Sequence, residues 1–465
     1  MAGTRKKKTT VGAIHPTALT YTAGRDVELD LTFVEADCLG TAAHVTMLSR
    51  MPVTPRIFST KQVKQVVHEL TAIIRMSRSG AFKIRVTDQD VHLAVERHLT
   101  ARLGDLGKKV HTGRSRNDQI ALDLRLFAKE ELLDLMAEAA EVARVLLSVA
   151  RRHIAVPMVG RTHMQKAMPS SVGLWATAHA ESLLDDLVLL TTVYKLNDQN
   201  PLGSAAGYGV PLPIDRELVT RLLGFHRTIH SVLYAGNARG KNESIILQAA
   251  GQVMLSLSRL VQDLMLFTMP EFGYFTLPPE YGTGSSMMPQ KNNPDVLELM
   301  RARAGKVLGH SFTIASIIKG APSGYNRDLQ EVKEPFVDGL AVTRASLQII
   351  VPILKGMKVN RKSLEAGFTA DVFATDWALE LVGGGMSFRD AYHQVKDNLD
   401  KLEREDPHRA IARKRHLGAT AGLDVEGVRH RVEEVVGFVR DRRRSFHKAL
   451  SNLLGIRYPR GIDIG

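Results

Sequence analysis

The stretch that determines the fold is 114–159, RSRNDQIALDLRLFAKEELLDLMAEAAEVARVLLSVARRHIAVPMV, which holds one proline and no glycine. This stretch predicts one very long amphipathic helix, because its apolar residues recur at intervals of three and four. Helical patterns longer than about 25 residues are typical of bundles and helical arrays, so we expect one of these architectures. The apolar positions are Leu122, Leu126, Leu132, Leu133, Met136, Ala140, Ala143, Leu146 and Leu147.

Four more segments carry a helical pattern of apolar residues: 61–76, 171–197, 242–269 and a stretch that follows Pro294. Glycine and proline are few for a chain of 465 residues, at 37 and 18, which favours long helices. The apolar faces of such helices are too long for one small domain to cover, and association of several chains would bury them. We therefore expect a long central helical bundle in an oligomer.

Breaks in these patterns divide the chain, and its length predicts about three domains. We expect a mostly helical N-terminal domain at 1–113, which begins with a disordered basic tail at 1–12. A central bundle at 114–364 and a small C-terminal domain of short helices at 365–465 would follow. Two loops rich in glycine and proline, 198–213 and 270–294, interrupt the bundle, and long loops of this kind often carry function.

The formal net charge of +13 is concentrated at the two ends of the chain. Residues 1–10 hold four basic side chains, and residues 401–465 hold 15 basic and 9 acidic residues. The body between them is nearly balanced, with 43 basic and 40 acidic residues. Solvated ends therefore explain the charge better than a nucleic-acid partner does.

Several classes of protein are excluded by what the sequence lacks. Cys38 is the only cysteine, which excludes an intramolecular disulfide and any zinc site with paired thiolates. No run of about 18 apolar residues predicts a membrane-spanning helix, and no apolar segment follows the basic start as in a secretory signal. Motifs for phosphate loops, dinucleotide binding and His-Glu-x-x-His zinc sites are absent. We expect a cytoplasmic protein that needs neither a cofactor nor a metal.

Two polar segments stand directly before predicted helices. HTGRSRNDQ at 111–119 contains Ser115 and Asn117, either of which could cap the longest helix. Its two arginines beside an asparagine would also form a good carboxylate site at a helix N-terminus. GRTHMQK at 160–166 contains His163, and a single histidine is more often structural than functional.

Two further polar segments lie in loops. GTGSSMMPQKNNPD at 282–295 joins glycine and serine to Lys291 and Asn293, and backbone N–H groups of such a loop can hold an anion; a plain linker is the alternative. GYNRDLQEVKE at 324–334 could line a pocket or form a charged surface turn. Together the four segments predict a site for a small polyanion with amide-like or guanidinium-like parts, and chemistry based on proton transfers.

GSSMMPQKNN at 284–293 resembles the signature loop of the fumarase/aspartase superfamily. Within this superfamily, the argininosuccinate lyases are the group that TGRSRNDQ at 112–119 and PQKNNPD at 289–295 resemble. The similarity extends from about residue 37 to residue 393. The resemblance implies a three-domain all-α fold and a homotetramer whose central domains form one bundle, with active sites built from three subunits. It also implies β-elimination of argininosuccinate to arginine and fumarate, the last step of arginine biosynthesis.

The same resemblance implies the roles of individual residues. Ser285 would remove the proton next to a carboxylate, and Lys291 would stabilise the resulting doubly charged aci-carboxylate together with Asn293. His163, paired with Glu298, would help to protonate the departing guanidino nitrogen. The implied substrate contacts are Arg116, Asn117, Thr162, Asn293, Tyr325, Gln330 and Lys333, with Asp90 and His92 as further candidates.

Three departures from the family pattern concern the arginine-like end of the substrate. Arg161 stands where an aromatic residue is usual, Asn292 stands where a basic residue is usual, and residues 21–30 lack the usual serine-rich segment. A lyase that releases fumarate from a different N-substituted aspartate is therefore the alternative. In addition, the sequence reveals no partner that would activate the hydroxyl of Ser285.

Overall fold

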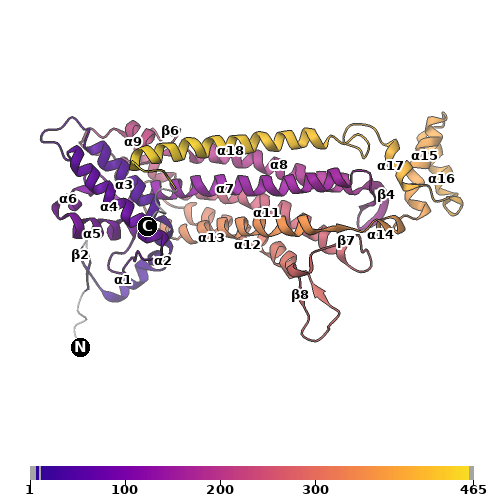
Figure 1. The fold of residues 1–465 in the computed structure, drawn as a ribbon, viewed down its shortest axis with the longest axis horizontal. Coiled ribbons are helices and arrows are strands. Elements are labelled where there is room, and N and C mark those ends of the chain that lie inside the picture. The colour runs from indigo at the N-terminus through magenta and orange to yellow at the C-terminus, as the bar shows by residue number, and fades with distance from the viewer. Residues whose placement is uncertain (1–6, 10–11, 460–465) are drawn as a thin grey trace.

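The computed structural model describes residues 7–9 and 12–459 and shows an elongated molecule built almost entirely of helices (Figure 1). The prediction of an all-α protein with a long central bundle is confirmed. Most of the expected basic tail lies outside the described residues, but its Lys7–Thr9 form strand β1, which pairs with β2. The long helices are α7 (Arg116–Arg152), α8 (Val172–Asn197), α11 (Lys241–Thr268), α12 (Asp295–Ile318), α13 (Lys333–Gly356) and α18 (Val425–Leu454).

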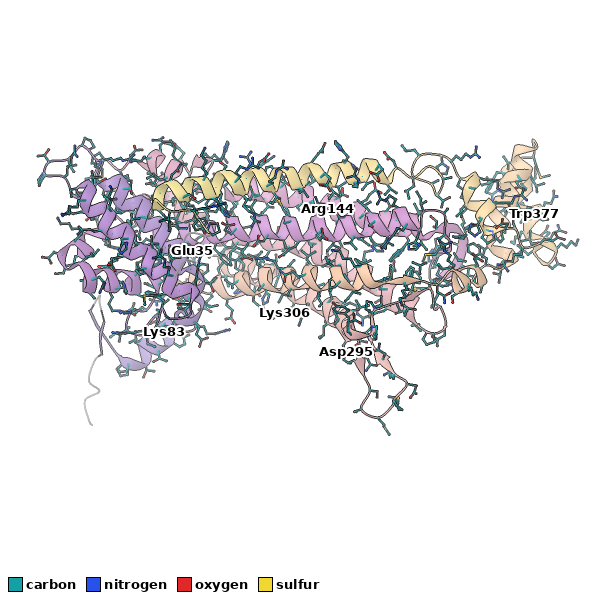
Figure 2. All side chains as sticks on the ribbon, viewed as in Figure 1. Glu35, Lys83, Arg144, Asp295, Lys306 and Trp377 are labelled. Carbon is teal, nitrogen blue, oxygen red and sulfur yellow. The ribbon has the colours of Figure 1, made fainter. Side chains whose placement is uncertain are left out.

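The bundle forms because each long helix buries an apolar stripe against its neighbours. α7 packs against α8, α13 and α18, while α11 packs against α12, α8 and α13. Their buried side chains form one continuous apolar cluster along the molecule. A bidentate ion pair between Arg144 of α7 and Glu433 of α18, at 2.8 and 2.5 Å, fastens two of the helices at mid-length (Figure 2).

The start of α7 is fixed by the predicted cap. Ser115 Oγ accepts a hydrogen bond from the backbone N–H of Asn117 at 3.3 Å, and Asp118 Oδ1 accepts one from the N–H of Ser115 at 2.9 Å. The helix ends at Arg152, so the expectation that it continues to residue 159 is wrong. Pro157 instead begins strand β3, because proline cannot donate to a helical hydrogen bond.

The region after residue 365 differs from the expected set of short helices. Residues 361–413 do form short elements, but α18 spans 30 residues and returns along the whole bundle (Figure 1). Its last turns, with Phe446 and Leu450, join the apolar cluster of the N-terminal elements. The short elements are α14 (Arg361–Ala366), η5 (Ala370–Phe373), α15 (Ala374–Gly383), α16 (Phe388–Lys396), η6 (Leu399–Lys401) and α17 (Pro407–Arg413).

Short helices cover one end of the bundle, where α7 begins. α3 packs against α4, α5 and α7, so that the first turns of α7 lie among these elements. The elements at this end before α7 are β1 (Lys7–Thr9), β2 (Gly12–Ile14), α1 (Pro16–Ala23), α2 (Asp26–Leu29), η1 (Asp30–Phe33), α3 (Val34–Leu48), α4 (Thr60–Arg78), α5 (Val91–Leu103), α6 (Asp105–Lys108) and η2 (Lys109–His111). Later parts of the chain add β5 (Gln199–Asn200), α9 (Arg216–Leu222), β6 (Arg227–Thr228), α10 (Val232–Asn237) and η4 (Arg327–Gln330).

Two β-hairpins stand outside the helical core. β3 (Pro157–Thr162) and β4 (Gln165–Ser171) form a hairpin at the end of the bundle opposite to the N-terminal elements (Figure 1). β8 (Thr283–Gly284) and β9 (Asn292–Asn293) form a hairpin that projects sideways from the bundle, with Asp295 near its base (Figure 2). The remaining elements in this region are β7 (Phe275–Thr276), which pairs with β10 (Lys358–Val359), and η3 (Pro279–Tyr281).

Among the described residues, two segments are long and apolar enough to cross a membrane by length and composition alone. They are 241–268, which is α11, and 327–356, which includes α13. Both belong to the bundle and bury much of their surface against neighbouring helices. They therefore match core helices of the bundle.

Candidate active site

Ser285 lies just beyond β8, in the projecting hairpin. Its Oγ accepts hydrogen bonds from the backbone N–H groups of Met287 at 3.2 Å and Met288 at 3.0 Å. Its own N–H donates to the carbonyl oxygen of Lys291 at 3.3 Å. Donors aimed at a hydroxyl oxygen favour negative charge on that oxygen. The backbone of the hairpin thus directs two N–H donors at Ser285 Oγ, a feature that the residue types alone do not reveal.

Three other predicted residues accompany Ser285 on this hairpin and the helix that follows. Lys291 is exposed and forms no ion pair among the described residues, and Asn293 pairs with Thr283 across the two strands. Glu298 lies one turn into α12 and is exposed, and its side chain has no hydrogen-bond partner in the described part of the chain. The group therefore faces outward from its own chain.

His163 occupies the tip of the β3–β4 hairpin at the far end of the bundle. His163 and Met164 both have positive φ angles, 52° and 64°, between the paired residues Thr162 and Gln165. A two-residue turn of this kind favours Asn and Gly, so histidine and methionine raise its conformational free energy. The imidazole is exposed and makes no hydrogen bond among the described residues. Strain at an exposed histidine favours a functional role over a structural one.

Arg161, the departure beside His163, has a clear structural environment. Its guanidinium lies 4.8 Å from the ring centroid of Phe272, and it donates a hydrogen bond to the carbonyl oxygen of Met164 at 3.2 Å. Through these two contacts, Arg161 supports the tip of the hairpin.

A cavity of about 110 Å³ lies at the opposite end, between the N-terminal elements and the start of α7. Seven of the predicted substrate residues meet there although their segments lie far apart in sequence: Asp90, His92, Arg116, Asn117, Tyr325, Gln330 and Lys333. The walls are completed by Asp26, Asp30, Gln89, Ile120, Arg239 and Arg327. The structure thus unites the first and fourth polar segments into one polar site.

Arg116 and Asp90 form an ion pair in the cavity wall, with 2.8 Å between the guanidinium and Oδ2. Asp90 is also the N-cap of α5, because its Oδ1 accepts a hydrogen bond from the N–H of Leu93 at 2.9 Å. Gln89 directly before it has a positive φ of 69°. The strained turn and the cap together hold the carboxylate that orients Arg116.

Lys333 differs from the expectation of a free substrate contact. Its side chain is buried, and its ammonium lies 2.8 Å from Asp26 Oδ2 and 2.6 Å from Asp30 Oδ1. Burial raises the pKa of Asp26 to about 6, although the nearby lysine opposes the rise. Lys333 therefore serves the cavity mainly by holding two carboxylates at its wall.

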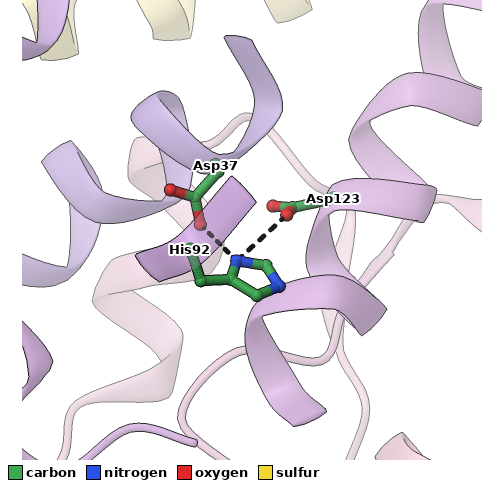
Figure 3. A group of neighbouring side chains, drawn as sticks. All are labelled: Asp37, His92 and Asp123. Atoms are coloured by element: carbon green, nitrogen blue, oxygen red, sulfur yellow. Dashed lines mark hydrogen bonds and ion pairs between the residues drawn. The ribbon is translucent and has the colours of Figure 1, made fainter. Parts of the chain in front are cut away.

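A buried cluster of Asp37, His92 and Asp123 lies behind the cavity (Figure 3). His92 Nδ1 is 2.8 Å from Asp37 Oδ1 and 3.6 Å from Asp123 Oδ2. The three potential ligand atoms lie within 4.8 Å of one another, which is close enough to hold a metal ion. However, Asp37 Oδ1 also accepts a hydrogen bond from Gln119 at 3.1 Å. The 2.8 and 3.1 Å contacts of this oxygen are ordinary hydrogen-bond distances between protein groups, so the arrangement is a hydrogen-bonded cluster.

The predicted residues therefore fall into three groups that one chain holds apart (Figure 1). The cavity lies at one end, Thr162 and His163 lie at the other end, and the Ser285 hairpin lies between them. The predicted pairing of His163 with Glu298 is not made among the described residues of a single chain.

Sequence reasoning missed several residues of the cavity and its surroundings. Asp26, Asp30, Asp37 and Asp123 are single acids within apolar or mixed segments, and only their burial distinguishes them. Arg239 precedes α11 in the polar stretch 237–244, which the sequence reasoning did not single out, and its guanidinium lies 5.6 Å from the ring centroid of Tyr325. An unpaired charge at a core-facing helical position was the one available signal, and it applies to Asp37 and Asp123.

Comparison with known proteins identifies a family model and sequence relatives that match this chain. A family model described as "Lyase" matches residues 36–309. An argininosuccinate lyase of Phocaeicola vulgatus is 39% identical over 90% of this chain and 92% of its own length. One of Sorangium cellulosum is 40% identical over 91% and 97%.

Solved structures agree in fold. EDDS lyase superposes with a TM-score of 0.80 at 19% identity, covering 94% of both chains. A class II fumarase of Schistosoma mansoni gives 0.67 at 17% identity, over 87% of this chain and 98% of the fumarase. The sequence relatives, this fold and the three polar groups described above agree with one another. We conclude that the chain belongs to the argininosuccinate lyase family of the fumarase/aspartase superfamily.

Proposed function

We propose that this chain cleaves argininosuccinate to arginine and fumarate, the activity named for its sequence relatives. The observation that carries the proposal is the β8–β9 hairpin, where Ser285 Oγ accepts two backbone hydrogen bonds close to Lys291. Such a group fits a reaction in which a proton leaves carbon while negative charge gathers on the adjacent carboxylate. The chemistry uses side chains and backbone donors of the protein.

The elimination proceeds by two proton transfers. Ser285 acts as an alkoxide, its hydroxyl proton having been given up before the reaction and its charge stabilised by the N–H groups of Met287 and Met288. The alkoxide takes the proton from the carbon next to a succinyl carboxylate and becomes the hydroxyl, and the electron pair of that C–H bond moves into the carboxylate as an aci-carboxylate. Lys291 and Asn293 stabilise its two negative charges. The pair then returns to form the C=C bond of fumarate as the C–N bond breaks. His163, with Glu298 beside it in the assembled site, gives a proton to the departing guanidino nitrogen.

The cavity holds the remainder of the substrate. Arg116 and Asn117 at the start of α7 offer donors to a carboxylate, and Tyr325 with Gln330 lines the opposite wall. Thr162 reaches the substrate from the hairpin that carries His163. These contacts orient the reacting carbon toward Ser285, which is the main requirement for efficient proton abstraction.

A homotetramer brings the three groups together. The cavity, His163 and Ser285 are far apart in one chain, and each group is open to solvent or lines a cavity. Exposed apolar side chains on the bundle, including Val188 of α8 and Phe312 of α12, support further helix packing between chains. Each site would combine residues of three subunits of a cytoplasmic enzyme.

Fumarate formation tests the proposal. Purified protein is incubated with argininosuccinate, adenylosuccinate and aspartate, and fumarate absorbance is followed. Fumarate from argininosuccinate alone is expected, and no fumarate from any of the three would contradict a lyase.

Ser285→Ala is expected to lower kcat at least about 100-fold, because general-base catalysis is lost. Ser286→Ala is the matched control, since Ser286 is an adjacent exposed serine on the same hairpin. Near-normal turnover by Ser285→Ala would show that another group removes the proton.

A different N-substituted aspartate is the second candidate substrate, and Asp26 is the observation that favours it. The residue lies in the segment that departs from the family pattern, and it adds a carboxylate to the cavity wall beside Asp30. A leaving amine with additional positive charge would suit this wall. Fumarate from such a compound, but not from argininosuccinate, would decide for it.

A further inference from the structure

The buried cluster of Asp37, His92 and Asp123 is not needed for the long helices to pack, yet it places three ionisable groups in the interior. All three residues are at most 5% exposed. They come from three separate elements, because Asp37 belongs to α3, His92 to α5 and Asp123 to α7. Burying such groups costs free energy, which is tolerated where they are paired or where they serve a function.

The geometry gives the two nitrogens of His92 different surroundings. Nδ1 faces the two carboxylates, at 2.8 Å from Asp37 and 3.6 Å from Asp123 (Figure 3). Nε2 lies on the opposite side of the ring and has no hydrogen-bond partner among the described residues. Because the ring lines the cavity, this nitrogen is the one available to a bound molecule.

The carboxylates on the two sides of Nδ1 also differ. Asp37 accepts hydrogen bonds from His92 and from Gln119, whereas neither oxygen of Asp123 has a partner among the described residues. Burial opposes the charge on Asp37, but the neighbouring imidazole outweighs it and lowers the pKa of Asp37. For Asp123, burial and the neighbouring Asp37 raise the pKa well above its usual value. Asp37 is therefore the partner that favours the ionised form, whereas burial and Asp37 disfavour a charge on Asp123.

The charges around His92 favour its protonated form. Burial lowers the pKa of His92, but Asp37 more than compensates and the net direction is upward, with Asp90 and Asp30 contributing in the same sense. The cations nearby are Arg114, which approaches Asp37 from the loop before α7, His111, and Lys333, which faces Asp123. An imidazolium that lines a cavity and has one N–H without a protein partner is a donor for an anion.

We propose that Asp37 is a positioning residue that holds His92 as an imidazolium, whose Nε2–H binds a carboxylate of the substrate in the cavity. The inference rests on the proposed function, because it assumes a substrate that carries the fumaryl carboxylates. Asp123 completes the pocket around the ring at 3.6 Å from Nδ1, and neither of its oxygens has a hydrogen-bond partner among the described residues. The role concerns binding, since the proton stays on His92 throughout.

The test measures binding of fumarate to the intact protein by calorimetry at pH 6, 7 and 8, together with KM and kcat. Asp37→Asn keeps the side-chain shape but removes the anion, so the imidazolium loses its proton at lower pH. Its affinity for fumarate is expected to fall at least about tenfold at pH 8, the loss of one charge-assisted hydrogen bond, and to recover toward pH 6. KM rises in parallel while kcat changes less.

Three variants make the result specific. Asp123→Asn should change fumarate affinity several-fold less than Asp37→Asn, because Asp37 bonds Nδ1 at 2.8 Å whereas Asp123 lies 3.6 Å from it. His92→Gln should bind fumarate weakly at every pH, without recovery toward pH 6. Asp186→Asn alters another buried carboxylate, on α8 and bonded to Ser256 at 2.6 Å, and should bind like the wild type.

Distinct outcomes separate the two proposals. If the wild type neither binds fumarate nor forms it, the proposed function fails and the inference fails with it. If the wild type binds fumarate and Asp37→Asn has the same affinity and pH profile, the inference alone is wrong. If EDTA abolishes activity, Zn²⁺ or Mn²⁺ restores it, and both aspartate variants are equally damaged, the cluster is a metal site and the inference is overturned.

Discussion

His44 shows how one buried side chain can make the stability of the fold depend on pH. It lies in α3, is fully buried, and its Nε2 is 2.8 Å from the carbonyl oxygen of Thr112, next to the segment that starts α7. Burial lowers the pKa of His44 well below its ordinary value of 6.5. The unfolded chain therefore takes up a proton near pH 6.5 while the folded chain does not. The stabilising contribution is complete above pH 6.5 and is lost as the pH falls below it.

His44→Gln should flatten this dependence, because glutamine can still donate to the carbonyl oxygen but does not titrate. The free energy of unfolding, measured by urea denaturation at fixed protein concentration between pH 8 and 5, should fall less steeply in the variant. The difference in slope approaches about 1.4 kcal/mol per pH unit below 6.5. His416→Gln, at an exposed histidine, should follow the wild type. Parallel curves for the His44 variant and the wild type would refute the prediction.

At the scale of elements, apolar spacing was sufficient for most of the bundle. It predicted α7, α8, α11, the start of α12 and α4 because each carries an apolar stripe without interruption. α18 was missed because arginines crowd its exposed faces, as at 440–444, and hide apolar positions such as Val432 and Val439. The four polar segments were found, but their grouping was not, because it depends on how the helices cross. Asp26 and Asp30 carry no local signal, whereas Asp37 offers only its charge at a core-facing helical position.

α18 also supports a prediction about stability. Its Phe446 is 1% exposed and lies 4.7 Å from the buried ammonium of Lys129, which is paired with Asp198. Phe446→Ala should lower the free energy of unfolding by about 3–5 kcal/mol, through lost burial and the cavity left behind. Phe438→Ala on the same helix is the control, because that ring is only half-buried and should cost clearly less. Equal losses in denaturant titrations would mean that the end of α18 is loosely docked.

At the scale of the whole molecule, the proposed tetramer would make activity depend on assembly, because one chain holds the three groups apart. Phe312 of α12 is 75% exposed although it belongs to none of the three groups. Phe312→Asp places a charge on the apolar face of the bundle, so it should shift the protein toward smaller species in size-exclusion chromatography with light scattering. Lyase activity should fall in proportion, because each site needs residues of several chains.

Leu417→Asp provides the comparison, since Leu417 is 90% exposed near the far end of the molecule. That variant should keep both the assembly and the activity. A monomeric Phe312→Asp protein with full activity would show that one chain can complete the site by itself.

The return of α18 has a consequence for how the protein is made. Its last turns, with Phe446 and Leu450, complete the apolar cluster formed by α3, α4 and α5. Contacts between segments about 400 residues apart cannot form until the ribosome has released nearly the whole chain, and contacts of such long range slow folding. The first helices to emerge during translation therefore stay incompletely covered until synthesis ends. A nascent chain that stalls before residue 425 should be a strong client of chaperones.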